Sequence, residues 1–198
     1  SELQLLQLFR ARRCDALFVA SCLPDSDDSY GELQKAGLPI IAIDREMDAT
    51  RFCSVVSDDH EASLQLTRSL LKPLPRHIAL IGARPELSIS RARASGFQHA
   101  LEGFEGAVIL EQGEAFSRAC GRRLAGDLLE RLGHLPDALV TTSYVLLQGV
   151  FDLLQSHALN PAHLHLGTFG DTQLLDFLPL PVNAMAQQHY LIAEKALA

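Results

Sequence analysis

The sequence predicts an α/β fold built on parallel β-sheets, and three observations indicate it. Short apolar runs alternate with longer stretches of helical periodicity. Most of the runs are apolar at consecutive positions, which is typical of parallel strands that helices cover on both faces. The chain has 198 residues, of which 47% are hydrophobic and 21% charged, so it can bury a substantial core. This length suits one large domain or two small lobes.

Apolar runs mark the predicted strands. In chain order they occupy residues 16–20, 39–43, 53–56, 78–81, 107–110, 138–141 and 164–169. In open parallel sheets, ligands bind beyond the carboxyl ends of the strands. We therefore expect functional residues directly after these runs.

Helices are predicted between the strands from their caps and apolar stripes. Asp58, with Glu61 three residues later, resembles a capping box at a helix start. A helix with an apolar stripe follows the run at 78–81, Gly133 stands at the C-cap of the next helix, and Ser143 is placed to cap another. The chain opens inside one helical pattern and stops inside another, so we expect it to be part of a larger domain.

Charge, hydropathy and cysteine usage exclude several classes of protein. The formal charge of −7 argues against direct binding of nucleic acid, because phosphate contacts dominate such binding. No apolar run reaches the roughly 20 residues of a membrane span, and the start lacks a signal-peptide pattern. Cys14, Cys22, Cys53 and Cys120 form no C-x-x-C pair, so we expect reduced, buried thiols. The interpretation is a cytoplasmic protein that does not bind membranes.

The segment IGARPELSISRAR carries Arg84, Arg91 and Arg93 between a predicted strand and a predicted helix. The first turn of a helix has a partial positive charge, so cations are unfavourable there. A nearby negative charge should compensate the positive charges of these arginines. It is either a nearby Asp or Glu or a bound ligand, and the local sequence leaves both open.

Polar and charged residues follow several of the predicted strands. They are Ser21, Asp44, Arg45, the stretch from Arg84 to Arg93, Ser143, and Gly170 with Asp171. Guanidinium groups suit phosphate and carboxylates suit sugar hydroxyls, because each offers paired, directional hydrogen bonds. The combination predicts a sugar-phosphate site. The alternative is that Asp44 and Arg45 form a solvated ion pair worth about 0.5 kcal/mol and that Arg91 points into water.

Signatures of enzymes and metal sites are absent or weak. The chain has no phosphate-binding loop, dinucleotide fingerprint or nucleophile elbow. Asp44 ends a strand as a phosphatase nucleophile does, but Glu46 stands where the second Asp is expected. His163 and His165 make an isolated H-x-H, which is a weak metal signal. Residues 25–28 lack the Gly and Glu of a calcium loop. We expect no enzymatic activity, cofactor or metal.

The chain resembles the effector-binding core of the LacI/GalR transcriptional repressors. The motifs that carry the resemblance cover nearly the whole chain: RCDALFVAS, IIAIDRE, SVVSDDHEASLQLTRSLL, IALIGARPELSISRARASGF, PDALVTTSYVLLQGVFDLL and LGTFGDTQLLDFLPLPVNAMAQQ. The resemblance implies two Rossmann-like lobes, of the periplasmic-binding-protein type, with the effector in the cleft between them. Residues 1–56 and 188–198 would form an incomplete first lobe, and residues 57–187 the second. Operator DNA would be bound only through a helix-turn-helix missing from this sequence.

Within that family, the motifs DRE, PELSIS, TTSYVLLQGV and TFGDTQLLDFL look most like the fructose-repressor group. This likeness implies fructose 1-phosphate as inducer and a homodimer or higher assembly, and it leaves open whether fructose 1,6-bisphosphate also binds. The resemblance assigns effector binding to Asp44, Arg45, Arg93, Phe116 and Ser143. Ser21, Arg91 and Asp171 complete the predicted effector site from their places after the strands. The sugar-binding Asp usual in the family is replaced by Gly170, which leaves Asp171 beside it.

The resemblance supports a hypothesis for the arginines. Arg93, with Arg45 and Arg91, would hold a phosphate that the empty protein lacks, and Asp44 would take sugar hydroxyls. Two other functions stay open. A periplasmic sugar-binding protein of a transporter has the same fold, and its sequence would begin with a signal peptide. An α/β enzyme acting on a sugar phosphate would turn its ligand over.

Overall fold

The computed structural model describes residues 2–11, 14–23, 27–170, 173–178 and 180–197. The chain divides into two compact units. Unit 1 comprises Ser1–Ser57, Glu86–Ile89 and Gln188–Ala198, and unit 2 comprises Asp58–Pro85 and Ser90–Gln187. The boundaries expected from the sequence place residues 57 and 86–89 in the second lobe, whereas here they group with unit 1.

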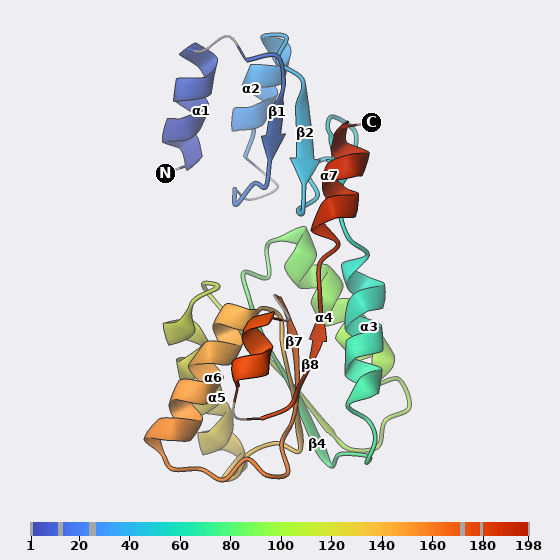
Figure 1. Cartoon of the computed structure of the whole chain (residues 1–198), viewed down its shortest axis with the longest axis vertical. Helices are drawn as coiled ribbons and strands as arrows, with labels where there is room; N and C mark the ends of the chain where they lie inside the picture. Colours follow the sequence, from blue (N-terminus) through green and yellow to red (C-terminus); the bar gives the residue numbers. More distant parts are fainter. Residues whose placement is uncertain (1, 12–13, 24–26, 171–172, 179, 198) are drawn as a thin grey trace. The chain divides into compact units, whose positions relative to one another are not determined.

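Unit 1 is built on a three-stranded sheet in the order β1-β2-β3, with parallel pairing throughout. Helices α1 and α2 pack against each other, and α7 contacts β2 and β3 (Figure 1). The elements are α1 (Glu2–Ala11), β1 (Leu17–Val19), α2 (Ser29–Lys35), β2 (Ile40–Ile43), β3 (Cys53–Val55) and α7 (His189–Leu197). The core of the unit consists of Leu6, Leu17, Tyr30, Leu33, Ile40 and Phe52.

Unit 2 is built on a five-stranded parallel sheet in the order β5-β4-β6-β7-β8. Its strands are β4 (His77–Ala83), β5 (Ala107–Gly113), β6 (Ala138–Thr141), β7 (His165–Phe169) and β8 (Val182–Met185). Its helices are α3 (Asp59–Ser69), α4 (Ser88–Ala100), α5 (Arg118–Leu132), α6 (Tyr144–Ser156) and the 3₁₀ helix η1 (Gln173–Phe177). Helices α3 and α4 cover one face of the sheet, and α5 and α6 cover the other (Figure 1).

The predicted α/β fold with parallel sheets is confirmed, and each predicted strand is present. The predicted caps are also confirmed. The Asp58 side chain accepts a hydrogen bond from the Glu61 amide at 3.0 Å, and Gly133 ends α5 with a φ of 74°. A positive φ of this size is the left-handed conformation that glycine adopts at low energetic cost.

The expectation of four buried thiols is only partly correct. All four cysteines are free, and Cys120 is buried, but Cys22 and Cys53 are exposed. Both lie in unit 1, whose small sheet covers fewer side chains than the sheet of unit 2. None of the helices that the structure describes is long and apolar enough to cross a bilayer.

Asp137 joins the amino-terminal ends of three strands of unit 2 through hydrogen bonds. Its carboxylate accepts hydrogen bonds from the amides of Arg76 and His77, each at 2.8 Å. Its own amide donates to the His77 carbonyl, and its carbonyl accepts from His165. Burial acts to raise the pKa of Asp137, but the hydrogen bonds from His77 and Arg76 outweigh it and hold this pKa below the usual value.

We expect Asp137→Asn to lower the free energy of unfolding by about 1 kcal/mol at pH 7, because the amide is a weaker acceptor for the two backbone donors and the site is partly exposed. The pKa is lower in the folded state. The stabilisation is therefore present above the unfolded pKa of about 3.9 and is lost as the pH falls through the folded pKa. In urea denaturation, the difference in free energy of unfolding between the wild type and Asp137→Asn should become smaller below pH 4. A difference that does not change with pH would contradict this role of the charge.

Candidate functional site

Arg93 is the most constrained charged residue that the sequence predicted to bind a ligand. It lies in the second turn of α4, and its side chain is buried. Its Nε donates to Oδ1 of Asp59 at 2.7 Å, and its Nη1 donates to the carbonyl of Thr142 at 2.6 Å. The guanidinium carbon also lies 4.0 Å from the ring centroid of Phe169, within the range of a cation–π interaction.

The elements around Arg93 explain this arrangement. Thr142 directly follows β6, Phe169 is the last residue of β7, and Asp59 is the first residue of α3. Because β6 and β7 are parallel, their carboxyl ends meet at one edge of the sheet. The structure thus places Arg93 at the edge where the sequence predicted ligand-binding residues.

The structure gives Arg93 a partner that the sequence hypothesis did not include. Asp59 supplies a carboxylate inside the fold, and the two side chains are only 6% and 7% exposed. An isolated buried guanidinium would be strongly unfavourable, so the charge is balanced before any ligand binds. Arg91 is exposed at the end of the first turn of α4, and Arg84 precedes the helix with a φ of 53°.

The remaining predicted residues of unit 2 have other surroundings. Ser143 follows Thr142 and caps α6, with its hydroxyl accepting from the Leu146 amide at 3.4 Å. Phe116 is half-buried against the apolar core on the side of α5 and α6. Asp171 lies outside the described residues. A structural role is therefore visible for Ser143 and Phe116.

We expect Ser143→Ala to lower the free energy of unfolding by about 1 kcal/mol, because α6 loses its N-cap acceptor. Ser143→Asp keeps an acceptor there and should retain most of the stability. Equilibrium urea denaturation checks both variants. Ser117→Ala, which removes the corresponding cap of α5, is the matched comparison. An Ala variant as stable as the wild type would show that the hydroxyl does not cap the helix.

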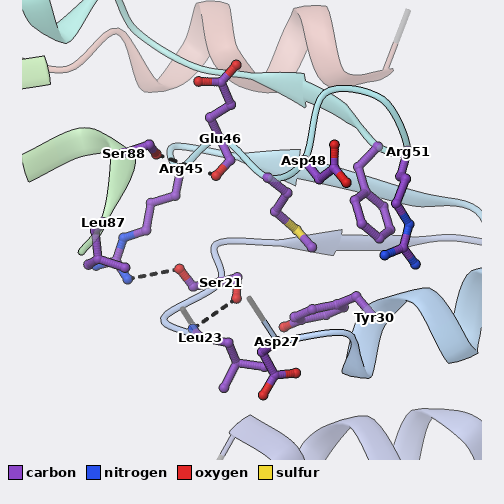
Figure 2. A pocket seen from close by; sticks show the side chains of 12 residues that line it. Ser21, Leu23, Asp27, Tyr30, Arg45, Glu46, Asp48, Arg51, Leu87 and Ser88 are labelled. Atoms are coloured by element: carbon purple, nitrogen blue, oxygen red, sulfur yellow. Dashed lines mark hydrogen bonds between the residues drawn. The ribbon is translucent and has the colours of Figure 1, made fainter. Parts of the chain in front are cut away.

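Two of the predicted residues meet in unit 1, at a small pocket (Figure 2). Nη1 of Arg45 donates to the Ser21 carbonyl at 3.1 Å and to Sγ of Cys22 at 2.6 Å. The Ser21 hydroxyl donates to Glu2 and accepts from the Leu23 amide. The pocket is lined by Ser21, Leu23, Asp27, Tyr30, Arg45, Glu46, Met47, Asp48, Arg51, Phe52, Leu87 and Ser88.

The Arg45 side chain has one buried donor without an acceptor among the described residues. Its Nε is buried and has no hydrogen-bond partner in the part of the chain that the structure describes. A buried donor without an acceptor costs about 1–3 kcal/mol, so an acceptor from outside the chain would stabilise it. Asp44 precedes it with a φ of 64°, a strained conformation for a residue other than glycine. The pocket itself holds only about 50 Å³, well below the ~300 Å³ of ordinary small-molecule sites.

Several residues of these sites were missed in the sequence. Asp59 looks like an ordinary acidic residue in the first turn of a helix, and nothing local connects it with Arg93, which is 34 positions away. Tyr30 is buried in unit 1 and donates to the Glu2 carboxylate. Burial raises the pKa of Tyr30, and the nearby Glu2 raises it further. Among the described residues, no group of three or more His, Cys, Asp or Glu is placed to hold a metal ion.

Comparison with known proteins decides the family. Residues 1–154 match the family described as periplasmic binding proteins and the sugar-binding domain of the LacI family. The chain belongs to this family. Crystal structures of LacI-family regulators at about 20% identity share its fold, including one from Escherichia coli with a TM-score of 0.79 that covers 99% of the chain.

Relatives of higher identity are regulators by name. The fructose operon regulatory protein of Vibrio cholerae is 43% identical over 100% of this chain, and the catabolite repressor/activator of E. coli K12 is 36% identical over the same share. The chain spans about 60% of the length of these two proteins. The Cra transcriptional dual regulator of Pseudomonas putida, crystallised with fructose 1-phosphate, is 70% identical, with a TM-score of 0.92 over 99% of this chain and 73% of that one.

Proposed function

We propose that this chain is the effector-binding part of a Cra-type transcriptional regulator and that fructose 1-phosphate is its effector. The observation that carries the proposal is the 70% identity, over 99% of the chain, to a Cra regulator crystallised with that sugar phosphate. Operator DNA would be bound through a domain outside this chain. We further propose a cytoplasmic homodimer, and the four free cysteines suit a reducing compartment.

The two arginines suggest different roles in effector binding. Asp59 already balances the charge of Arg93, so we assign Arg93 to the sugar oxygens. Arg45 has a buried Nε without a partner among the described residues, so we assign it to the phosphate. Asp44 would accept from sugar hydroxyls. Ser21, Arg91, Phe116, Ser143 and Asp171 complete the proposed set.

Fixed geometry favours tight binding by Arg93. Its guanidinium is oriented by Asp59, by the Thr142 carbonyl and by the Phe169 ring before the ligand arrives. A pre-organised side chain loses less conformational entropy on binding, so more of its interaction energy contributes to affinity. The effector would favour the DNA-free state of the regulator only by the difference in its affinity for the two states.

Isothermal titration calorimetry of the full-length regulator tests the proposal. We expect fructose 1-phosphate to bind with one site per chain, and fructose and glucose 6-phosphate to bind at least about 100-fold more weakly, because each lacks either the phosphate or the matching sugar hydroxyls. Phosphorus NMR of the same mixture should show the ligand unchanged. No binding of fructose 1-phosphate would refute the effector, and its conversion to product would favour an enzyme.

A further inference from the structure

The amino-terminal edge of the unit 2 sheet holds a pocket that the proposed function does not use. Its volume is about 360 Å³, and it is lined by Pro73, Leu74, Pro75, Arg76, Asp137, Ala162, His163 and His165. It contains both histidines of the H-x-H motif. Within unit 2 it lies at the opposite end of β7 from Arg93, because His165 begins that strand and Phe169, beside Arg93, ends it.

The basic side chains of this pocket, one arginine and two histidines, have no partner among the described residues. The side chains of Arg76, His163 and His165 make no hydrogen bond or ion pair with any residue in the described ranges. Arg76 and His163 are exposed and His165 is half-buried. Asp137, the one acid among the lining residues, is already hydrogen-bonded to two backbone amides. The pocket therefore presents donors whose acceptors are missing.

We propose that this pocket is a second ligand site, separate from the effector site, which binds a small organic anion with at least two negative charges. Arg76 would pair with a phosphate or carboxylate group through its planar guanidinium, and His163 and His165 would donate from their ring nitrogens. Its volume falls within the ~300–1,000 Å³ of ordinary small-molecule sites. Leu74, which is 71% exposed, and the two flanking prolines offer an apolar wall to the carbon skeleton.

Three other titratable groups lie beside the pocket or line it. His77 is 3.7 Å from the Asp137 carboxylate, and its ring is 4.8 Å from that of His134. The pKa of Asp137 is lowered, so its carboxylate keeps a negative charge beside the donors of the pocket.

NMR of the histidine ring signals, with pyrophosphate as probe, tests the site on the full-length regulator. At pH 6 and constant ionic strength, we expect saturable shifts of the His163 and His165 signals. Arg76→Gln and His163→Gln should each weaken binding about tenfold, because each removes a charge-assisted donor. Both side chains are exposed, so neither variant should unfold.

The matched control is His99→Gln. His99 lies on α4 and pairs with Glu102 outside this pocket, so this variant should bind pyrophosphate as the wild type does. Calorimetry with fructose 1-phosphate should give the same affinity for Arg76→Gln as for the wild type, which separates this site from the effector site. Shifts that grow linearly with concentration, or an affinity of Arg76→Gln for pyrophosphate equal to that of the wild type, would overturn the proposal.

Discussion

The Arg93→Met variant is expected to lose about 3–5 kcal/mol of its free energy of unfolding, because the change leaves the buried carboxylate of Asp59 without its cation. The Asp59 side chain is only 7% exposed, so water cannot replace the guanidinium. The Thr142 carbonyl loses its donor as well. Urea denaturation, followed by circular dichroism, measures the change. A loss below 1 kcal/mol would mean that the pair is not buried in solution.

A double replacement distinguishes the loss of the ion pair from a general loss of folding. Asp59→Leu combined with Arg93→Met removes both charges, and apolar replacements of buried pairs are often neutral or stabilising. We expect the double variant to be more stable than either single variant, and a double-mutant cycle gives the coupling free energy. The same double variant should still fail to bind fructose 1-phosphate. Recovered binding would show that Arg93 does not contact the effector.

Gly149→Ala is expected to destabilise unit 2 by about 2–3 kcal/mol or more, because it would force apart α5 and α6. A Cβ at this position would lie 2.1 Å from the Arg118 carbonyl oxygen and 2.4 Å from the Arg122 amide nitrogen. Both contacts are with backbone, which cannot move aside as a flexible side chain can. Gly121 has the same role on the facing helix, where a Cβ would lie 2.2 Å from the Leu146 carbonyl oxygen.

The control for this prediction lies on α5 itself. A Cβ at Gly126 would find only Leu153 within reach, at 3.9 Å, and the residue has no positive φ. Gly126→Ala should therefore stabilise the helix by about 0.5–1 kcal/mol, since alanine loses less backbone entropy than glycine. Thermal denaturation of the two variants should give shifts of opposite sign. Two shifts of the same sign would contradict the close approach of the helices.

Much of the fold could be predicted because its strands are apolar on both faces. β4 and β6 are nearly completely buried, and their runs stand out from the amphipathic helices around them. The missed elements are those with weak local signals. β8 (Val182–Met185) is a partly exposed edge strand, and α2 (Ser29–Lys35) is short and contains Gly31. Tertiary packing, rather than local propensity, holds both in place.

Only part of the candidate site could be predicted from the sequence. The rule that ligands bind at the carboxyl ends of parallel strands led to Arg93 and Arg45, and the structure places both there. The partner of Arg93 could not be predicted, because Asp59 is brought to it only by the packing of α3 beside α4. Charge balance within a buried pair depends on distances between elements, which a hydropathy pattern does not contain.

We propose that fructose 1-phosphate binds through Arg45 and Arg93, and a crystal structure of the full-length regulator grown with this sugar phosphate would show whether it does. We expect phosphate oxygens within hydrogen-bonding distance of the Arg45 guanidinium and sugar oxygens within that distance of Arg93, at about 2.7–3.2 Å. Density for the ligand that touches neither arginine would show that these side chains do not bind the effector.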